Sequence, residues 1–293
     1  GSALDAIETS QPADQHVTLV RDAWPYAGQA LHANGYLGIF NALPDRDTSD
    51  YGRFAEAIGG IDWAYQCAEL DRALRLCDAL LDESDHPAVR LFALTKRLYV
   101  YVARGDGAAA YGDLAQLVCM CRDGMRRTDD PVMCNVSCLC ALSIETLLVT
   151  NLFDDDSYSR DVSEVPQQLR GLLGYFLGHR ALHRSKVGLA EGIAYSSLSI
   201  AGSSGRREAV GCNLLAASAQ LFADELDNAT AAFRRAWSLS GRGQIAMPFV
   251  ESDYCLMGLV RRCGDLCDEP GYRRISWQTR ASASRVRSSA FRR

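Results

Sequence analysis

The most suggestive candidate for a functional site in this sequence is a pair of histidines one helical turn apart. His179 and His183 lie in the stretch GYFLGHRALHR, and Tyr175 lies one turn earlier on the same helical face. Histidines at this spacing can bind a metal ion, but the sequence shows no third ligand and arginines flank both rings. We therefore interpret this face as solvated or groove-lining rather than as a metal site.

Five cysteines between Cys119 and Cys140 form a second candidate site. If the two stretches that carry them are antiparallel helices, four of the thiolates come close enough to surround zinc. However, Cys119 and Cys121 lie about 200° apart on a helix, so both do not easily point inward. Buried cysteine is also a common small apolar side chain between packed helices. The sequence leaves both interpretations open, although we expect no metal and no other cofactor.

Motifs for catalysis and nucleotide binding are missing from the sequence. It contains no G-x-S-x-G, H-E-x-x-H, G-x-G-x-x-G or GxxxxGK[ST] pattern, and no motif ties one of its five histidines to a serine or cysteine. We expect that the protein is not an enzyme. A catalytic site assembled from distant segments remains the minor alternative.

The composition is that of an ordinary globular protein. The chain has 293 residues, of which 48% are hydrophobic and 23% charged, and its formal net charge of -5 gives no whole-chain case for nucleic-acid binding. After Gly1 and Ser2 there is no signal peptide, and no uncharged run reaches the ~18 residues of a membrane span. We expect a cytoplasmic protein without membrane contact, its eleven scattered cysteines mostly reduced.

Apolar residues recur at spacings of three and four almost throughout, which predicts an all-α protein. Four helical stretches also share one pattern of small and bulky residues, anchored on alanines that are separated by 37, 80 and 39 residues: Ala73, Ala110, Ala190 and Ala229. The interval of 80 is two periods of 40, so a further, degenerate unit is expected over CNVSCLCALSIETLLVTNLF and the irregular stretch after it. A fixed period of this length is typical of helical repeats.

Each unit should be a pair of helices that pack through small residues. In the first helix of one unit, Gly178 is expected where a small residue is needed. In the last unit, ADELDN turns the chain without glycine. Asp224, Asp227 and Asn228 are expected to cap the next helix and to tolerate the turn geometry.

These units resemble tetratricopeptide repeats, which have Leu-Gly and Tyr in the first helix and Ala, a bulky residue and Ala in the second. The longer period resembles the tetratricopeptide-like α-α superhelix of LuxR-type transcriptional regulators of the large maltose-activator class. The segment GRGQIAMPFVESDYCLMGLVRRC is similar to the place where the last repeat of that family ends. The resemblance implies a superhelical solenoid over residues 55–265.

The flanking regions follow from this division. Residues 1–54 are interpreted as N-terminal helices or a degenerate first repeat. Residues 266–293 are interpreted as an arginine-rich linker or tail, with a solvated final helix as the alternative. The family's DNA-binding domain, which would follow, and its nucleotide-binding domain are not in this sequence, so the resemblance implies a piece of a longer regulator that contacts DNA only through the missing domain.

The resemblance also implies a concave groove lined by the first helix of each unit, where a ligand would bind. The positions transferred from the family pattern carry aromatic and polar side chains, which is typical of binding surfaces: Asp62, Tyr65, Thr95, Tyr99, Tyr175, His179, His183, Ser218 and Phe222. Each ring taken singly is also explained as a cover for apolar surface between repeats.

The sequence thus predicts a signal-sensing and protein-interaction domain of a bacterial transcriptional regulator. A small-molecule inducer or a partner protein would bind the groove and change the conformation or the self-association of the array. The alternative is a stand-alone adaptor that binds a peptide segment of another protein. The expected groove lacks the basic cluster that a clamp for peptide carboxylates needs, which favours the first interpretation.

Overall fold

The computed structural model describes residues 48–127, 131–150, 152–153, 167–201, 206–241 and 243–252, together with positions 256, 259 and 263. Side chains are described from residue 57 onward. Nearly all of residues 1–54 and all of 266–293, the predicted flanking regions, lie outside the described residues. The described part of the chain is helical, in agreement with the all-α prediction, and contains these helices: α3 (Thr48–Gln66), α4 (Leu70–Glu83), α5 (Pro87–Arg104), α6 (Gly107–Met125), α7 (Pro131–Leu148), α8 (Gln167–His183), α9 (Val187–Ala201), α10 (Arg206–Phe222), α11 (Leu226–Leu239) and α12 (Met247–Glu251).

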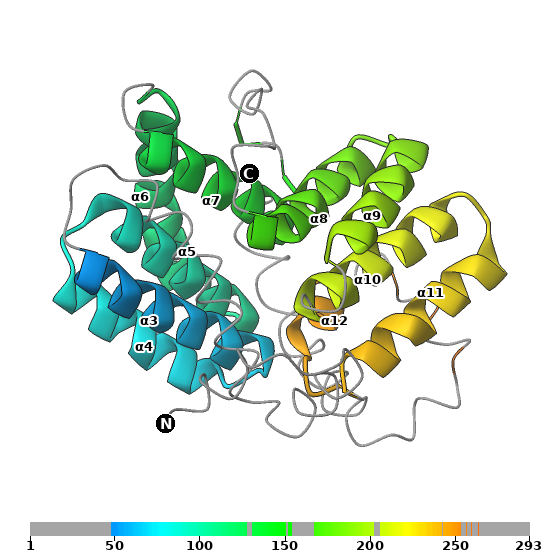
Figure 1. The fold of residues 1–293 in the computed structure, drawn as a ribbon, viewed down its shortest axis with the longest axis horizontal. Coiled ribbons are helices and arrows are strands. Elements are labelled where there is room, and N and C mark those ends of the chain that lie inside the picture. The colour runs from blue at the N-terminus through cyan, green and yellow to red at the C-terminus, as the bar shows by residue number, and fades with distance from the viewer. Residues whose placement is uncertain are drawn as a thin grey trace, which may run out of the picture.

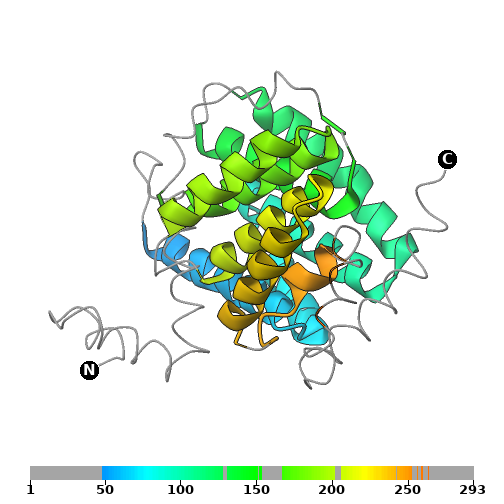
Figure 2. The ribbon, with the colours of Figure 1, turned by 90° about the vertical axis from the view of Figure 1, so that its right-hand side faces the viewer.

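The helices pack in sequence as antiparallel pairs, arranged in two curved layers (Figure 1). Helices α3, α5, α7, α8 and α10 contact one another in that order and form the inner layer. Helices α4, α6, α9 and α11 each pack on their inner partner and form the outer layer. Figure 2, which faces the α11 side, shows the short α12 beside the last pair. The arrangement is that of a helical repeat.

Four of the pairs turn in the same way, which gives the repeat a backbone signature. The left-handed residues of these turns are Ala68, Gly105, Ser185 and Asp224, with φ of 60°, 72°, 59° and 59°. In each turn the next N–H reaches back to a carbonyl five residues earlier, at 2.8 or 2.9 Å, as in a Schellman motif. The turn residues are spaced as the anchor alanines are, so the predicted period is confirmed in these four units.

The degenerate unit ends its first helix with the same turn. Val149 is left-handed at φ 53°, and the N–H of Thr150 bonds the carbonyl of Glu145 at 3.1 Å. The end of α7 therefore repeats the geometry of the other inner helices. The second half of this unit, over the irregular DDDSYSRDVSEVP stretch, lies outside the described residues apart from Leu152 and Phe153 just before it.

The turn before α11 agrees with the prediction only in part. Asp224 adopts the left-handed conformation without glycine, as expected. The predicted capping is wrong, because the N-cap residue is Glu225 and no side chain caps the helix. Asn228 instead donates from its side-chain amide to Glu225 Oε2 at 2.9 Å. The turn is thus held by the backbone bonds of the Schellman motif rather than by a side-chain cap.

The anchor alanines lie at the contacts between the two layers. Ala73, Ala190 and Ala229 are fully buried, and Ala110 is 1% exposed. Gly178 is equally confined, because a Cβ at this position would collide with the side chain of Leu215 on α10. Small residues at these positions let the helices approach closely, as the sequence pattern indicates.

Among the described residues, none of the helices is both long enough and apolar enough to cross a membrane.

Replacing Gly178 by alanine tests the close approach of α8 and α10. We expect Gly178→Ala to lower the free energy of unfolding by about 1–3 kcal/mol, because Leu215 must shift out of a packed position. Gly192→Ala on α9 is the matched control, since a Cβ there meets nothing within 4 Å and helix propensity alone should raise stability by about 0.5–1 kcal/mol. Urea unfolding measures both, and an equal effect of the two changes would contradict the packing.

Candidate functional site

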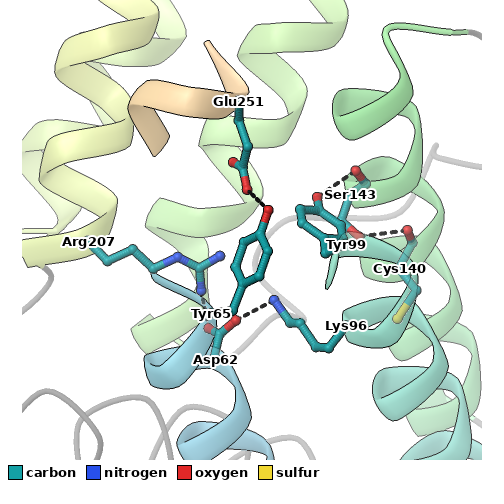
Figure 3. A network of polar contacts seen from close by, with 8 residues as sticks. All are labelled: Asp62, Tyr65, Lys96, Tyr99, Cys140, Ser143, Arg207 and Glu251. Atoms are coloured by element: carbon teal, nitrogen blue, oxygen red, sulfur yellow. Dashed lines mark hydrogen bonds and ion pairs between the residues drawn. The ribbon is translucent and has the colours of Figure 1, made fainter. Parts of the chain in front are cut away.

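Polar side chains from distant parts of the chain meet on the inner side of the array (Figure 3). Asp62 and Tyr65 come from α3, and Lys96 and Tyr99 come from α5. The Arg207 side chain points from the start of α10 toward Asp62, and the Glu251 side chain points from α12 toward Tyr65. We call these six residues and Gln66 of α3 the inner polar network. Its members are buried, apart from Glu251, which is partly buried.

Asp62 is the centre of charge in the network. Its carboxylate forms ion pairs with Lys96 Nζ through one oxygen and with Arg207 Nη1 through the other. Asp62 is fully buried, and Lys96 and Arg207 are only 5% and 8% exposed. An unpaired charge at such depth is strongly unfavourable, so the three groups are stable inside only together. Asp62 thereby joins α3 to both α5 and α10.

Gln66 extends this contact by one turn of α3. With its amide oriented to suit its neighbours, the side-chain oxygen accepts from Arg207 Nε at 3.1 Å and from Nη2 at 3.2 Å. The guanidinium of Arg207 is therefore held by α3 through two residues. The planar guanidinium can donate to Asp62 and to Gln66 on the same face of α3 at once. The ammonium group of a lysine lacks this geometry.

Two tyrosines of the network direct their hydroxyls to different acceptors. The Tyr65 hydroxyl donates to Glu251 Oε1 at 2.8 Å, and the Tyr99 hydroxyl donates to the Ser143 carbonyl of α7 at 2.7 Å. The two rings are nearly perpendicular, with centroids 5.4 Å apart, and Lys96 Nζ lies 5.4 Å from the Tyr99 centroid. Edge-to-face packing and a cation above a ring are both favourable, so the aromatic and charged groups support each other.

Burial raises the pKa of Glu251 above its ordinary value, and the Tyr65 hydrogen bond and the positive charge of Arg207 partly oppose this. Burial also raises the pKa of Tyr65, Tyr99 and Tyr175 well above the ordinary value of a tyrosine. The negative charge of Glu251 is the second largest cause of the increase in all three. The three phenols therefore keep their protons and act as donors. One carboxylate influences all three.

The network closes the array on itself. In an open helical repeat each unit contacts only its neighbours. Here α3 is joined to α10 by the Asp62–Arg207 pair and to α12 by the Tyr65–Glu251 hydrogen bond. The Ala246 N–H, just before α12, donates to the Gln66 carbonyl at 2.8 Å, and Ile245 packs on Trp63. The first and last described units are therefore in direct contact.

Tyr175, His179 and His183 form a second group along α8. The Tyr175 and His179 rings are 4.5 Å apart between centroids, and the two histidine rings are 6.0 Å apart. His179 is 1% exposed, and burial lowers its pKa to about 3, while burial lowers that of the half-buried His183 to about 4. Both imidazoles are neutral at pH 7. Tyr175 connects this group to the inner polar network, since Glu251 and Arg207 both affect its pKa.

The remaining predicted residues lie apart from these groups. Thr95 and Ser218 are buried, and their hydroxyls donate to carbonyls of their own helices, Leu91 at 2.7 Å and Leu214 at 2.9 Å. Phe222, at the end of α10, is 60% exposed. The structure therefore gathers Asp62, Tyr65 and Tyr99 at one point and places Tyr175, His179 and His183 beside it.

Besides Gln66, which lies one turn after Asp62, three members of the network are absent from the predicted groove residues. Lys96 directly follows the predicted Thr95, whereas Arg207 lies between Arg206 and Glu208 and stands out from neither. Glu251 belongs to the AMPFVE segment, which suggested a family but no site. One signal was visible: Lys96 is one of only two lysines in the chain and sits inside the apolar stretch LFALTKRLYVYV. A lysine in such a stretch, on the face that carries the predicted Tyr99, indicates a buried partner.

The cysteine cluster shows packed thiols in the part of the chain that is described. Cys121 and Cys140 are buried, and burial raises the pKa of both, to about 12 for Cys140. Cys119 is exposed, and the Cys134 thiol lies 3.2 Å from the Met125 carbonyl. Within the described residues, no three His, Cys, Asp or Glu side chains are gathered as a metal site would need.

Comparisons of the chain with protein-family models, with curated proteins and with solved structures found no match. The fold and the inner polar network therefore carry the functional argument.

Asp62→Asn tests whether the ion pairs hold the array together. The change leaves Lys96 and Arg207 buried without their carboxylate, so we expect a loss of about 3–5 kcal/mol in the free energy of unfolding. The control is Asp85→Asn, because Asp85 is fully exposed and its replacement should change stability by less than about 0.5 kcal/mol. Equal losses in urea unfolding for the two variants would contradict the central role of Asp62.

The two histidines predict a pH dependence of stability. Their pKa values in the folded protein lie below the ordinary 6.5, so the stability they contribute is complete above pH 6.5 and is lost as the pH falls toward 4. Each histidine lowers the free energy of unfolding by up to about 1.4 kcal/mol per pH unit in that range. His179→Gln should flatten the slope between pH 6.5 and 4 and leave it unchanged from pH 7 to 8. An unchanged slope in acid would show that His179 is accessible to protons in the folded state.

Proposed function

We propose that this chain is the signal-sensing and protein-interaction domain of a transcriptional regulator, similar to the tetratricopeptide-like arrays of LuxR-type regulators. The supporting features are the period of near 40 residues, the repeated Schellman turns and the sequence of the closing segment around α12. DNA would be contacted only through a separate domain. The proposal assigns the chain no catalytic role.

One observation carries the proposal. The short helix α12 is held to α3 by polar contacts and to α11 by aromatic contacts. Glu251 and the Ala246 amide bond α3, whereas Phe249 packs edge to face on Phe233 and Trp237 of α11. Loss of the polar contacts would leave α12 attached to α11 and free it from α3. The chain beyond α12 would then be presented differently.

A ligand can shift this equilibrium only by binding the closed and open arrangements with different affinity. The inner polar network satisfies that condition, because its groups are paired in the closed arrangement and would be available for other partners in the open one. We propose that an inducer acts there, and that opening also changes the surface used for self-association. A difference of about 3 kcal/mol in binding free energy would shift the balance more than 100-fold.

The burial of the predicted groove residues distinguishes this proposal from a peptide adaptor. An adaptor of the predicted kind would hold an extended peptide along the inner layer, where Tyr65, Tyr99 and Tyr175 are at most 5% exposed. An extended peptide would have to separate the inner helices over the whole length of the peptide. A small molecule needs only to replace a few contacts between α3 and α12. The buried rings and few polar groups therefore favour a small inducer.

The test introduces Tyr65→Phe into the full-length protein, which is measured both after purification and in the cell that naturally produces it. The change removes the hydroxyl that bonds Glu251 and keeps the ring. In the purified protein, we expect the Ala246 amide to exchange its hydrogen at least about tenfold faster, since a loss of about 1.4 kcal/mol corresponds to a factor of ten. In the cell, the messenger RNA levels of a defined set of genes should change.

Tyr101→Phe is the matched control, because Tyr101 on α5 is partly exposed and lies outside the inner polar network. It should leave both amide exchange and transcripts as in the unaltered protein. Faster exchange in Tyr65→Phe without any change in transcripts would show that the closure exists but does not control transcription, and the proposed function would be wrong.

A further inference from the structure

The inner polar network carries one more positive than negative charge until Glu251 is counted. Lys96 and Arg207 are both paired with the single carboxylate of Asp62. These three groups together leave a charge of +1 in a buried environment, where such a charge is costly. Glu251 supplies the missing negative charge, although it comes from α12, which alone among the described helices is not part of the two layers.

Buried hydroxyls around Glu251 are not fully used. The Tyr175 and Ser252 hydroxyls are buried and lie beside each other, and neither reaches another acceptor among the described residues. Tyr175 is 5% exposed and Ser252 is fully buried. Two hydroxyls that bond only each other leave one of their two hydrogens without an acceptor, which indicates capacity for another group beside the charged network.

The groups around Glu251 can still bind a hydrogen-bond acceptor, because their acceptors are occupied and donors remain. The Asp62 carboxylate is occupied by two cations, and the Ser143 carbonyl is occupied by Tyr99. Two donors remain: the Tyr65 hydroxyl, which donates to Glu251, and one hydroxyl of the Tyr175–Ser252 pair, which bond only each other. Two hydroxyl donors next to a net positive charge fit a group that only accepts hydrogen bonds and is negatively charged. A carboxylate has both properties.

Glu251 is suited to leave such a position. Its side chain is partly buried rather than enclosed, and among the described residues the Tyr65 hydroxyl alone donates a hydrogen bond to it. Burial raises its pKa, whereas the Tyr65 hydrogen bond and the charges of Arg207 and Lys96 act in the opposite direction. The groups with the largest effect on it are Tyr65, Arg207, Lys96 and Asp62, all of which belong to the inner polar network.

We propose that Glu251 is an intramolecular ligand in a carboxylate-binding site formed by Tyr65, Tyr175 and the positive charge of Arg207 and Lys96, and that a small organic acid displaces it. The acid would take the hydrogen bond of Tyr65 and the donor that the Tyr175–Ser252 pair leaves unused. The Glu251 side chain would turn into water, and the contact between α3 and α12 would open while α12 stays packed on α11. This inference rests on the proposed function, for which it names the chemical class of the inducer.

Glu251→Ala with acetate as the probe tests the site directly. The substitution keeps Cβ and removes the part of the side chain that acetate replaces. We expect the variant to have a lower Tm than the unaltered protein and acetate to raise it by about 3 °C at a concentration of several dissociation constants. Acetamide, which has the same shape but no charge, and sodium chloride at equal ionic strength should not.

Two control variants separate the site from a general effect of the salt. Asp85→Ala removes a fully exposed carboxylate, so acetate should shift its Tm no more than it shifts that of the unaltered protein. The triple variant Glu251→Ala, Tyr65→Phe, Tyr175→Phe lacks both donors and should lose the response. An acetate shift that is equal in Glu251→Ala and Asp85→Ala, or undiminished in the triple variant, overturns the proposal.

Glu251→Gln keeps the experiment decisive if Glu251→Ala does not fold without acetate. Glutamine retains an acceptor for Tyr65 and fills the position, so it should fold and show no response to acetate. The measured quantity for Glu251→Ala then becomes the folded yield on refolding in acetate compared with acetamide. A yield that is the same in both overturns the proposal.

The two proposals fail separately. If Glu251→Ala shows no acetate response while Tyr65→Phe still changes transcripts, the carboxylate site is wrong and the regulatory function stands. If acetate restores Glu251→Ala while Tyr65→Phe leaves the transcripts unchanged, the site is present but does not serve transcription.

Discussion

The arrangement of this protein depends on a buried carboxylate that two cations share. Asp62 on α3 holds Lys96 of α5 and Arg207 of α10, and all three are nearly inaccessible to water. Such a group is stable only when every member is present, since a single missing partner leaves a charge in an apolar environment. The contact also spans 145 positions in sequence, so it joins units that a simple helical repeat would keep apart.

The repeated turn explains how these units come to meet. In four of the described hairpins the first helix ends with a left-handed residue and the same pair of backbone hydrogen bonds, so these units are related by a similar rotation. Small residues such as Ala73 and Ala229 keep the layers close at equivalent points. A constant rotation between packed units produces curvature. Over the units described, that curvature brings α12 to α3 (Figure 1).

The contacts that close the array differ in kind from those that build it. Within and between neighbouring units, the helices meet mainly through buried apolar side chains. At the closure the contacts are largely hydrogen bonds and ion pairs, with the Trp63–Ile245 pair as an apolar contribution. Apolar packing offers a small polar ligand little to replace, whereas a hydrogen bond can pass to another acceptor at low net cost. This difference places the adjustable part of the molecule at the junction of α3 and α12, which is the physical basis of the functional proposals.

The sequence by itself determined the helical class, the period and the packing positions, because these follow from local spacing. Apolar residues at three and four residue intervals specify helices, and alanines such as Ala110 and Ala190 recur wherever two helices touch. The inner layer was also partly visible, since Asp62, Tyr65 and Tyr99 were placed on it correctly. Only the tertiary structure decided that these residues are buried and that Arg207 and Glu251 join them. Closure depends on small rotations that accumulate over several units, and no local pattern in the sequence records their sum.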